Sequence, residues 1–589
     1  MRHRLVARIH ASLARVAGRV TSSAAVADPP ASAHPAIAAA GTVVRSTSAT
    51  GAAHRGSTLA AGVAAVGVLF GAWGAVNPSA MAQSSRTFVP QLNNPINRVS
   101  DANRAYPVYF EAWSQIDSTD PQAPLGLNMP MTIGSPQLRD AMAWAGRGPQ
   151  QDAIEILLEK RDGATSRREG RNATYRELFG LPYGVDYVPL DMQLSDFAVF
   201  IEDDQLYTAD FAYLDKVEQL FLLAIAEGHR RAEAGEPGEG VEPLLAAVRI
   251  ARQMTERAYA VENRMGVNML RKVGDLTRAY MWEYRDGLDV SDFEVIAGEF
   301  ELLRPGQVQL PWANRLIGEQ LMLEVFDATT NLPDEEFADV MAEFESRDRP
   351  IRRFHAAKRW EGLLEAIDKD AGGDITRRIF LPDIGQAIED VDQDFRRRWN
   401  LPLHDPIHSD ETLFELLDPI REAVVVETFA DLDGLRELRL RMIADVRGTA
   451  IAAGIAAFQK RDGGRAPRAL SQVYPTFIKV EQTLVDPYNS SYEYFEYFTA
   501  QSTDRRLIGW TFDVEVGNMG TIQLPENTPI LYSVGPDNRD NGAAKHSGSL
   551  ERSNDSDIIY WLPVEYIMER DPMDVSFQSG ASASGARGG

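Results

Sequence analysis

Two short acidic segments near the C-terminus carry residue types and spacings that suit a hard cation. Residues 535–542 read Gly-Pro-Asp-Asn-Arg-Asp-Asn-Gly, and residues 554–557 read Asn-Asp-Ser-Asp. Calcium takes oxygen ligands from carboxylates, amides and carbonyls, so closely spaced Asp and Asn beside a turn-forming Gly can supply its site. Plain turns use the same residues, and no Glu completes a loop of the EF-hand type after the first Asp. The candidate ligands for Ca²⁺ are Asp537, Asp540, Asp555 and Asp557.

The chain of 589 residues offers few other signs of catalysis. It contains no cysteine, which excludes disulfide frameworks, thiolate zinc sites, iron–sulfur clusters and thiol nucleophiles. It also lacks a phosphate-binding glycine loop, a Gly-x-Ser-x-Gly elbow and a His-Glu-x-x-His pair. Acidic runs at 202–204 and 334–336 could supply two catalytic carboxylates. A chain with 85 acidic residues contains such runs by chance, however.

The histidines outside the first 82 residues do not form a metal-binding pattern. His404 and His408 are close in sequence, but Pro406 between them prevents a shared face of a regular helix. This pair therefore predicts a surface loop rather than a zinc site. His229 and His355 each stand among arginines, which predicts exposed positions on helices.

The net charge of −25 is unevenly distributed along the chain. Residues 1–82 contain seven Arg and one Asp, a charge of +6, and the remainder carries −31. Residues 1–56 are rich in small residues and hold too few large apolar side chains to form a core, which predicts a disordered basic leader. The acidic remainder argues against nucleic-acid binding, because that binding depends on Lys and Arg at phosphates.

Residues 59–76 form an uncharged apolar run that follows His54-Arg55 and precedes Ala80-Met81-Ala82. A basic flank, an apolar segment and a small-x-small site are the parts of a secretory signal. They predict export with cleavage after Ala82. The run is also just long enough to span a bilayer, so residues 57–82 are either a signal peptide or a membrane anchor, with a buried helix as a third interpretation. We expect membrane contact only if the run stays uncleaved.

Residues 83–434 predict a helical domain. The clearest apolar periodicity spans 206–234, and a second spans 241–284 after a break at 236–240. Two long helices joined by so short a turn form an antiparallel hairpin, whose apolar residues pack in a core. Further predicted helices are one opened by Ser135-Pro136 and those at 151–160, 291–303 (capped by Ser291), 311–329, 333–346, 351–369, 383–399 and 411–426.

The hairpin also contains a two-part sequence motif, Ala-Glu-Gly at 226–228 and the segment from Leu244 to Arg252. In this it resembles a group of uncharacterised exported envelope proteins from planctomycete-type bacteria, in which a secretion signal leads into a long helical region. The resemblance implies an exported protein and carries no known activity.

A different pattern begins near residue 435. Residues 435–460 read as one helix, followed by a Gly-rich turn and a second short helix. Asp-Pro-Tyr-Asn at 486–489 predicts a turn. Four strands are predicted at 492–498, 507–516, 530–534 and 558–562. These features indicate an α+β module over residues 435–570. The last residues, 571–589, are small and polar and predict a disordered tail.

Four short sequence motifs follow one another within this module. They are Asp-Gly-Gly-Arg-Ala-Pro at 462–467, Val-Asp-Pro-Tyr-Asn-Ser-Ser-Tyr at 485–492, Leu-Tyr-Ser-Val-Gly-Pro-Asp at 531–537 and Asp-Ile at 557–558. In these the module resembles the head domain of the major pseudopilins of type II secretion. The resemblance implies a long helix packed on an antiparallel sheet. It also implies calcium held by Asp537, Asp555 and Asp557.

The chain departs from the pseudopilin pattern at its N-terminal side. It has no prepilin cleavage site followed by an apolar helix, and the helix at 435–460 is polar on one face. We therefore expect no assembly as a pilus subunit, since a shared fold does not transfer a function.

The expected fold class is α+β, with a large, mostly helical body of helical hairpins followed by a small pilin-head-like module. We expect an exported cell-envelope protein, periplasmic or anchored and facing the periplasm. It would act as a non-enzymatic scaffold in contact with envelope proteins or secretion machinery. The alternative is a secreted hydrolase with a carboxylate site between the helical body and the C-terminal module.

Overall fold

A computed structural model describes the chain from Thr87 onward, with gaps. The described residues are 87–116, 126, 133–158, 173–202, 204–303, 308–325, 381–401, 405–417, 422–489, 493–499, 508–511, 519–522, 528–536, 538–540, 543, 557–563 and 576–577. All of them belong to one compact unit, residues 76–589. The basic leader and the apolar run at 59–76 lie outside the described residues.

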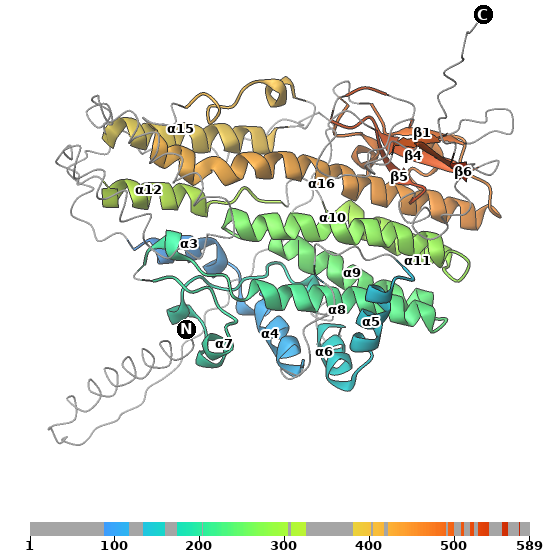
Figure 1. Cartoon of the computed structure of the whole chain (residues 1–589), viewed down its shortest axis with the longest axis horizontal. Coiled ribbons are helices and arrows are strands. Elements are labelled where there is room, and N and C mark those ends of the chain that lie inside the picture. The colour runs from blue at the N-terminus through green and yellow to red at the C-terminus, as the bar shows by residue number, and fades with distance from the viewer. Residues whose placement is uncertain are drawn as a thin grey trace, which may run out of the picture. The chain divides into compact units, whose positions relative to one another are not determined.

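Short helices form the first part of this unit. They are α3 (Phe88–Asn97), α4 (Tyr106–Gln115), α5 (Pro136–Ala145), α6 (Gly148–Leu158) and α7 (Leu190–Leu194). The predicted start at Ser135-Pro136 is confirmed: the Ser135 hydroxyl accepts a hydrogen bond from the backbone nitrogen of Leu138 (3.2 Å), and Pro136 opens the first turn. Helices α4, α5 and α6 pack against α8, on one side of the longer helices (Figure 1).

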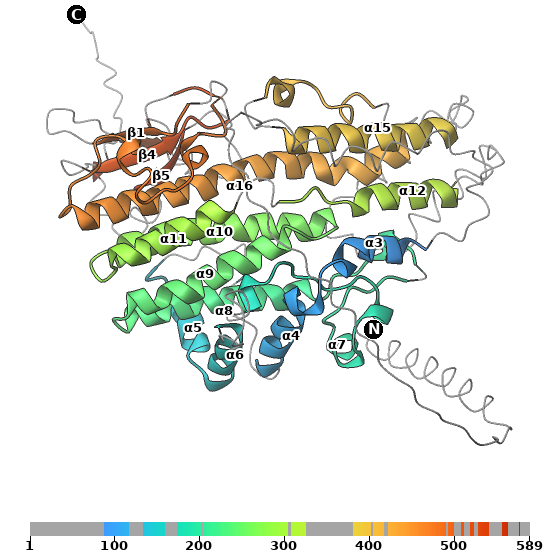
Figure 2. The same ribbon diagram turned by 180° about the vertical axis from the view of Figure 1, so that it is seen from behind.

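Longer helices follow and pack in chain order. They are α8 (Leu214–Glu233), α9 (Pro237–Met254), α10 (Ala260–Glu283) and α11 (Val290–Leu302). Helix α8 packs on α9, α9 on α10, and both α10 and α11 pack on α16 (Ala423–Arg461). Helices α12 (Ala313–Val325) and α15 (Leu381–Asn400) cover the N-terminal half of α16, as the views from both sides show (Figures 1 and 2).

The C-terminal region holds two small antiparallel sheets. One has the order β1 (Glu496–Thr499), β4 (Pro529–Ser533), β5 (Ile558–Trp561), and the other has the order β2 (Ile508–Thr511), β3 (Met519–Ile522), β6 (Ser576–Phe577). In the first sheet Tyr497 pairs with Leu531, and Tyr532 pairs with Ile559. Strands β4 and β5 pack against α16. The described chain is therefore mostly helical with a small antiparallel part, which confirms an α+β fold.

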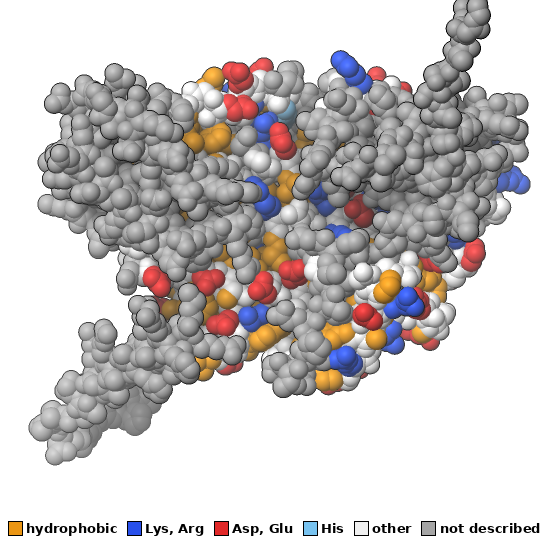
Figure 3. Space-filling view, in the orientation of Figure 1, with side chains coloured by type: hydrophobic (Ala, Val, Ile, Leu, Met, Phe, Trp, Pro, Cys, Tyr) orange, Lys and Arg blue, Asp and Glu red, His pale blue; other side chains and the backbone are white. Residues whose placement is uncertain are grey.

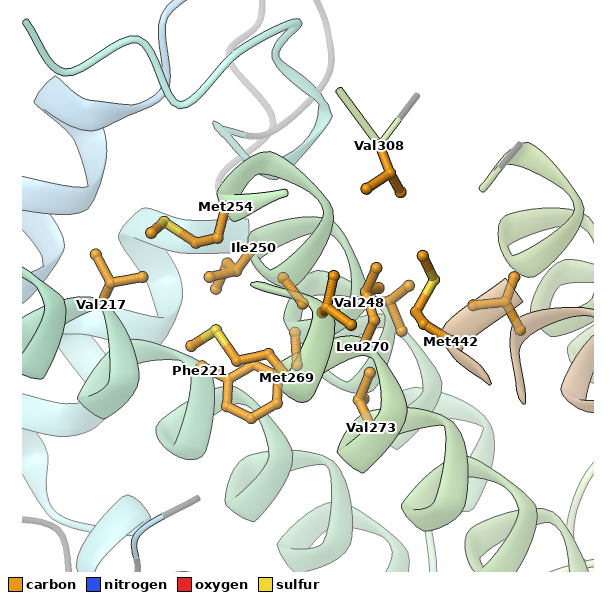
Figure 4. Packing of buried hydrophobic residues seen from close by; sticks show 14 of the residues in the cluster. Val217, Phe221, Val248, Ile250, Met254, Met269, Leu270, Val273, Val308 and Met442 are labelled. Atoms are coloured by element: carbon orange, nitrogen blue, oxygen red, sulfur yellow. The ribbon is translucent and has the colours of Figure 1, made fainter. Parts of the chain in front are cut away.

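The core between the long helices consists of aliphatic, Met and aromatic side chains. Val217 and Phe221 of α8, Ile250 and Met254 of α9, and Met269 of α10 gather in one part of it (Figure 4). Nearby, side chains of α9 and α10 meet Met442 of α16. Interdigitated packing of this kind confirms that the apolar periodicity marks core positions.

The predicted hairpin is only partly correct, because the second helix is interrupted. Helix α9 ends at Met254 and α10 begins at Ala260. The turn is held by Glu262, which accepts hydrogen bonds from Tyr183 (2.7 Å), Arg257 (2.9 Å) and the backbone nitrogen of Tyr259 (3.2 Å). No Gly or Pro marks this turn in the sequence, since a buried ion pair takes their place.

The first turn of the hairpin also differs from the prediction. Residues 237–240 are helical rather than part of the break, because Pro237 suits the first turn of a helix. Gly228 and Gly240 meet where α8 crosses α9: a Cβ atom on Gly228 would lie 2.9 Å from the carbonyl oxygen of Gly240. The two glycines therefore allow the backbones to approach closely.

Helix α16 contradicts the predicted helix start at residue 435. It runs without a break from Ala423 to Arg461, over 39 residues. The predicted boundary between residues 434 and 435 therefore falls inside a helix. Its N-terminal half packs on α12 and α15, and its C-terminal half packs on the strands (Figure 2). One helix thus belongs to both the body and the module.

Smaller differences concern other element ends. Helix α8 begins at Leu214 rather than near residue 206, and α11 has Asp289 rather than Ser291 at its N-cap. Strands β3 and β6 were not predicted, and β6 lies within the predicted disordered tail, 571–589, where it pairs with β3. The predicted helices at 333–346 and 351–369 lie outside the described residues.

In the part of the chain that the structure describes, no helix combines the length and the apolar character needed to cross a bilayer.

Candidate functional site

Three arginines of α10 face α16. Arg264, Arg271 and Arg278 are spaced by seven residues, about two helical turns, so they share one helix face. Arg264 donates to the backbone carbonyl oxygen of Asp431 (3.1 Å), and Arg278 donates to Oγ1 of Thr449 (2.5 Å). The later arginine along α10 contacts the later residue along α16, so these contacts set the register of α10 against α16.

Asp445 lies where the two helices meet the C-terminal strands. Its side chain is 4% exposed, and both carboxylate oxygens accept hydrogen bonds. Oδ2 accepts from Nε of Arg271 in α10 (3.0 Å), while Oδ1 accepts from Nε of Arg441 in α16 (3.0 Å) and from the hydroxyl of Tyr560 in β5 (3.1 Å). We call Asp445, Arg271, Arg441 and Tyr560 the junction cluster.

The charges of the junction cluster keep Asp445 ionised. Burial alone would raise the pKa of Asp445, but the guanidinium groups of Arg441 and Arg271 outweigh it and hold this pKa below its usual value. Burial and the charge of Asp445 raise the pKa of Tyr560 well above its usual value, so its hydroxyl keeps its proton. An ionised carboxylate, two guanidinium cations and a neutral phenol form the cluster at neutral pH.

Gly448 lets Tyr560 reach this cluster. The ring of Tyr560 packs directly on the backbone of α16, where a Cβ atom on Gly448 would overlap it. Without that close approach the Tyr560 hydroxyl would lie too far from Asp445 to donate a hydrogen bond. The same ring lies 5.2 Å from the guanidinium carbon of Arg278, a favourable cation–π distance.

A second buried carboxylate joins a turn to the sheet. Asp486 is 1% exposed and accepts hydrogen bonds from the hydroxyl of Ser533 in β4 (2.9 Å) and from the backbone nitrogens of Val534 and Tyr488 (both 3.0 Å). Burial raises the pKa of Asp486, and these hydrogen bonds oppose the rise. The predicted turn signal at 486–489 is therefore confirmed, and its Asp fixes the turn against β4.

A third buried carboxylate joins α11 to the segment after α16. Glu301 accepts hydrogen bonds from the backbone nitrogens of Lys479 (3.0 Å) and Val480 (2.9 Å) and from the hydroxyl of Thr483 (3.2 Å). Together with Asp445 and Asp486, it makes the set that we call the junction carboxylates.

The structure describes two of the four predicted calcium ligands. Asp557 is fully buried and accepts a hydrogen bond from the backbone nitrogen of Ala543 (2.7 Å), and Asp540 accepts one from the Tyr532 hydroxyl (2.9 Å). Asp537 and Asp555 lie outside the described residues. Within the described ranges, no three His, Asp or Glu side chains are grouped so that they could hold a metal ion. Calcium binding stays a prediction.

His229 contradicts the prediction of an exposed position. It is fully buried, its ring centroid lies 5.2 Å from that of Tyr280, and neither ring nitrogen has a hydrogen-bond partner among the described residues. Burial lowers the pKa of His229 to about 4, so the ring is neutral at physiological pH. The nearby arginines are explained by Glu227, which pairs with Arg230 and Arg231. His355 and His404 lie outside the described residues.

Glu256 is a carboxyl group that the sequence did not single out. It lies in the turn between α9 and α10, and its buried Oε2 atom has no hydrogen-bond partner in the described part. Burial raises the pKa of Glu256 to about 8, with Arg252 opposing the rise and Glu177 adding to it. A carboxyl group with this pKa can take up or release a proton near neutral pH.

No protein-family model, no curated protein and no solved structure matches this chain. The resemblance to pseudopilin heads therefore rests on the four sequence motifs at 462–467, 485–492, 531–537 and 557–558.

Proposed function

We propose that the protein is an exported scaffold of the cell envelope, with a pseudopilin-head-like C-terminal module, and that it works by protein contacts rather than by catalysis. Its partners would be envelope proteins or secretion machinery. The sequence supports export through the basic flank, the apolar run at 59–76 and the small-x-small site at Ala82. The charge of −31 after residue 82 suits a soluble, acidic surface outside the membrane.

The junction carboxylates carry the non-enzymatic part of this proposal. A hydrolase with its site between body and module would need a carboxyl group free to exchange a proton. Asp445, Asp486 and Glu301 instead each accept hydrogen bonds from several protein donors. Their role is to fix α10, α11, α16 and β4 against one another, which suits a rigid scaffold.

Melting of isosteric variants of the full chain tests this role. A buried carboxylate that joins elements should lower the melting temperature when it becomes an amide, whereas replacing a catalytic carboxylate often leaves stability unchanged or raised. We expect Asp445→Asn, Asp486→Asn and Glu301→Gln each to melt several degrees lower. Asp431→Asn, whose side chain is 31% exposed, is the matched control and should melt as the parent does. Unchanged or raised melting temperatures of the three junction variants would contradict the scaffold role.

A secreted hydrolase is the second candidate, and Glu256 is the observation that favours it. Its position in the α9–α10 turn lies away from the junction, so this version of the hydrolase differs from a site between body and module. Such an enzyme would lose its activity in Glu256→Gln while keeping or gaining stability, because the variant removes an unpaired buried carboxyl group. A panel of ester, peptide and glycoside substrates, compared between parent and variant, distinguishes the two functions.

A further inference from the structure

The two arginines of the junction cluster hold unused hydrogen-bond donors. Arg271 and Arg441 each donate to Asp445 from Nε alone. The two terminal nitrogens of each side chain have no partner among the described residues and are not buried. The side chains are 15% and 25% exposed. Two guanidinium groups held on one carboxylate thus point further donors toward the surface.

A third unused donor lies beside them. The backbone nitrogen of Tyr488 is bound to Asp486, and the carbonyl oxygen of Val485 accepts a hydrogen bond from Arg447 of α16 (2.8 Å), so the turn is fixed on the helix. The Tyr488 hydroxyl has no partner in the described part and is not fully buried. Burial and the charges of Asp445 and Asp486 raise the pKa of Tyr488, and the charges of Arg441 and Arg271 oppose this rise, so the phenol lies within range of both arginines.

Within the junction cluster, two guanidinium cations share one carboxylate. Arg271 and Arg441 carry two positive charges, and Asp445 supplies one negative charge. Asp275 also acts on Arg441, and Asp486 acts on Tyr488, so these two carboxylates reduce the positive excess. Arg278, the next arginine along α10, pairs with Asp275. On the face shown in Figure 3, Lys and Arg side chains lie over α16 and α10 together with acidic ones. A ligand with more than one negative charge would balance the cluster, as a phosphate monoester of about −1.5 to −2 does.

We propose that Arg271, Arg441 and Tyr488 form a binding site for the phosphate group of a small molecule. Planar guanidinium groups bind phosphate through two parallel hydrogen bonds each, and a phenol can donate a further one. Asp445 then acts as the positioning residue, because it holds both guanidinium groups by Nε and leaves their outer edges for the ligand. This site goes beyond the scaffold function, since it gives the junction a ligand.

Calorimetric titration of the full chain with inorganic phosphate and with phenyl phosphate tests the site at constant ionic strength. We expect both to bind, and tighter binding of phenyl phosphate would identify a monoester rather than free phosphate as the ligand. Tyr488→Phe removes a hydroxyl that has no protein partner, so the fold should be kept. Loss of one charge-assisted hydrogen bond should weaken phosphate binding about tenfold. Arg441→Gln should weaken it at least as much.

Two matched variants serve as controls. Tyr494→Phe removes a hydroxyl of the same region that bonds to Glu481, and Arg396→Gln removes an arginine paired with the buried Asp392 of α15. Neither should change phosphate affinity. The proposal is overturned if the parent binds neither phosphate probe, or if Tyr488→Phe binds phosphate as tightly as the parent does. The Tyr488 result decides even if Arg441→Gln fails to fold.

Discussion

Asp445, Asp486 and Glu301 each join segments that are distant in the sequence. A buried carboxylate is costly to desolvate, and it is tolerated only where donors satisfy it. Its hydrogen bonds are directional, so they fix how two segments are aligned. An apolar contact tolerates a shift of one segment by one residue, while a carboxylate with two or three fixed donors does not. At the scale of single residues, the register of the junction depends on these oxygens.

His229 should make the protein sensitive to acid. Its pKa is about 4 in the folded protein against about 6.5 when unfolded, so the unfolded chain binds the proton first. The associated stability is complete above pH 6.5 and is lost as the pH falls from there through 4, up to about 3 kcal/mol. Urea unfolding of the parent and of His229→Phe between pH 7 and pH 4 checks this. The variant should lose less stability over this range, and equal losses would exclude the histidine as a cause.

The predicted calcium site has its own test. If Asp537, Asp540, Asp555 and Asp557 hold Ca²⁺, added calcium should raise the melting temperature relative to chelator, because a ligand of the folded state stabilises it. Asp537→Asn and Asp555→Asn should reduce this shift. They are the informative variants, since Asp540 and Asp557 also bond to Tyr532 and Ala543. Identical melting temperatures with calcium and with chelator would contradict calcium binding.

Sequence reasoning missed the junction cluster for a physical reason. Asp445 is one of 85 acidic residues, and nothing local distinguishes it, because its partners come from α10 and β5. A signal was present in α10, where Arg264, Arg271 and Arg278 recur at heptad spacing. The aspartate of the predicted turn at 486–489 was visible, since an Asp-Pro turn is a local feature.

At the scale of elements, α16 combines the body and the module. Its small residues decide how closely the strands approach: Gly448 lies under the ring of Tyr560, while Gly434 is exposed, and a Cβ there would meet only the end of the Arg264 side chain, at 3.4 Å. Gly434 and Gly448 of the same helix thus have opposite roles.

Gly448→Ala should destabilise the protein by about 1–3 kcal/mol, because the added methyl group pushes Tyr560 away from Asp445. Gly434→Ala is the matched control and should be neutral or stabilising by up to about 1 kcal/mol, since Ala favours a helix. Chemical unfolding of both variants measures the difference. Similar stabilities of the two would show that β5 does not depend on the close approach at Gly448.

The helices could be predicted because their apolar periodicity is local, and most of those described lie near the expected ranges. The errors occurred where tertiary contacts override local signals. The α9–α10 turn depends on the buried Arg257–Glu262 pair instead of Gly or Pro. The continuous α16 crosses residue 435 because both of its halves are covered by partners. Strand β6 has only two residues, and β3 (Met-Gly-Thr-Ile) has a Gly in place of a side chain, so neither shows an alternating pattern.

At the scale of the whole molecule, body and module should unfold together. Helix α16 runs through both, and the ring of Trp282 in α10 lies edge-on to that of Trp561 in β5, with centroids 5.7 Å apart. In urea, helix loss measured by circular dichroism and exposure of β4 amides measured by hydrogen exchange should give one midpoint. An earlier transition of the β4 amides would instead mean that the module is an independent domain.

The mature N-terminus tests the proposed function most directly. Mass spectrometry of the protein from fractionated cells should find a chain that starts at Gln83 outside the inner membrane, or one that keeps residues 59–76 and sits in the membrane fraction with its acidic part outside. Either result fits an exported envelope scaffold, and the choice between them settles cleavage. A chain that keeps residues 1–82 and is recovered from the cytoplasm would contradict export, and with it the proposed function.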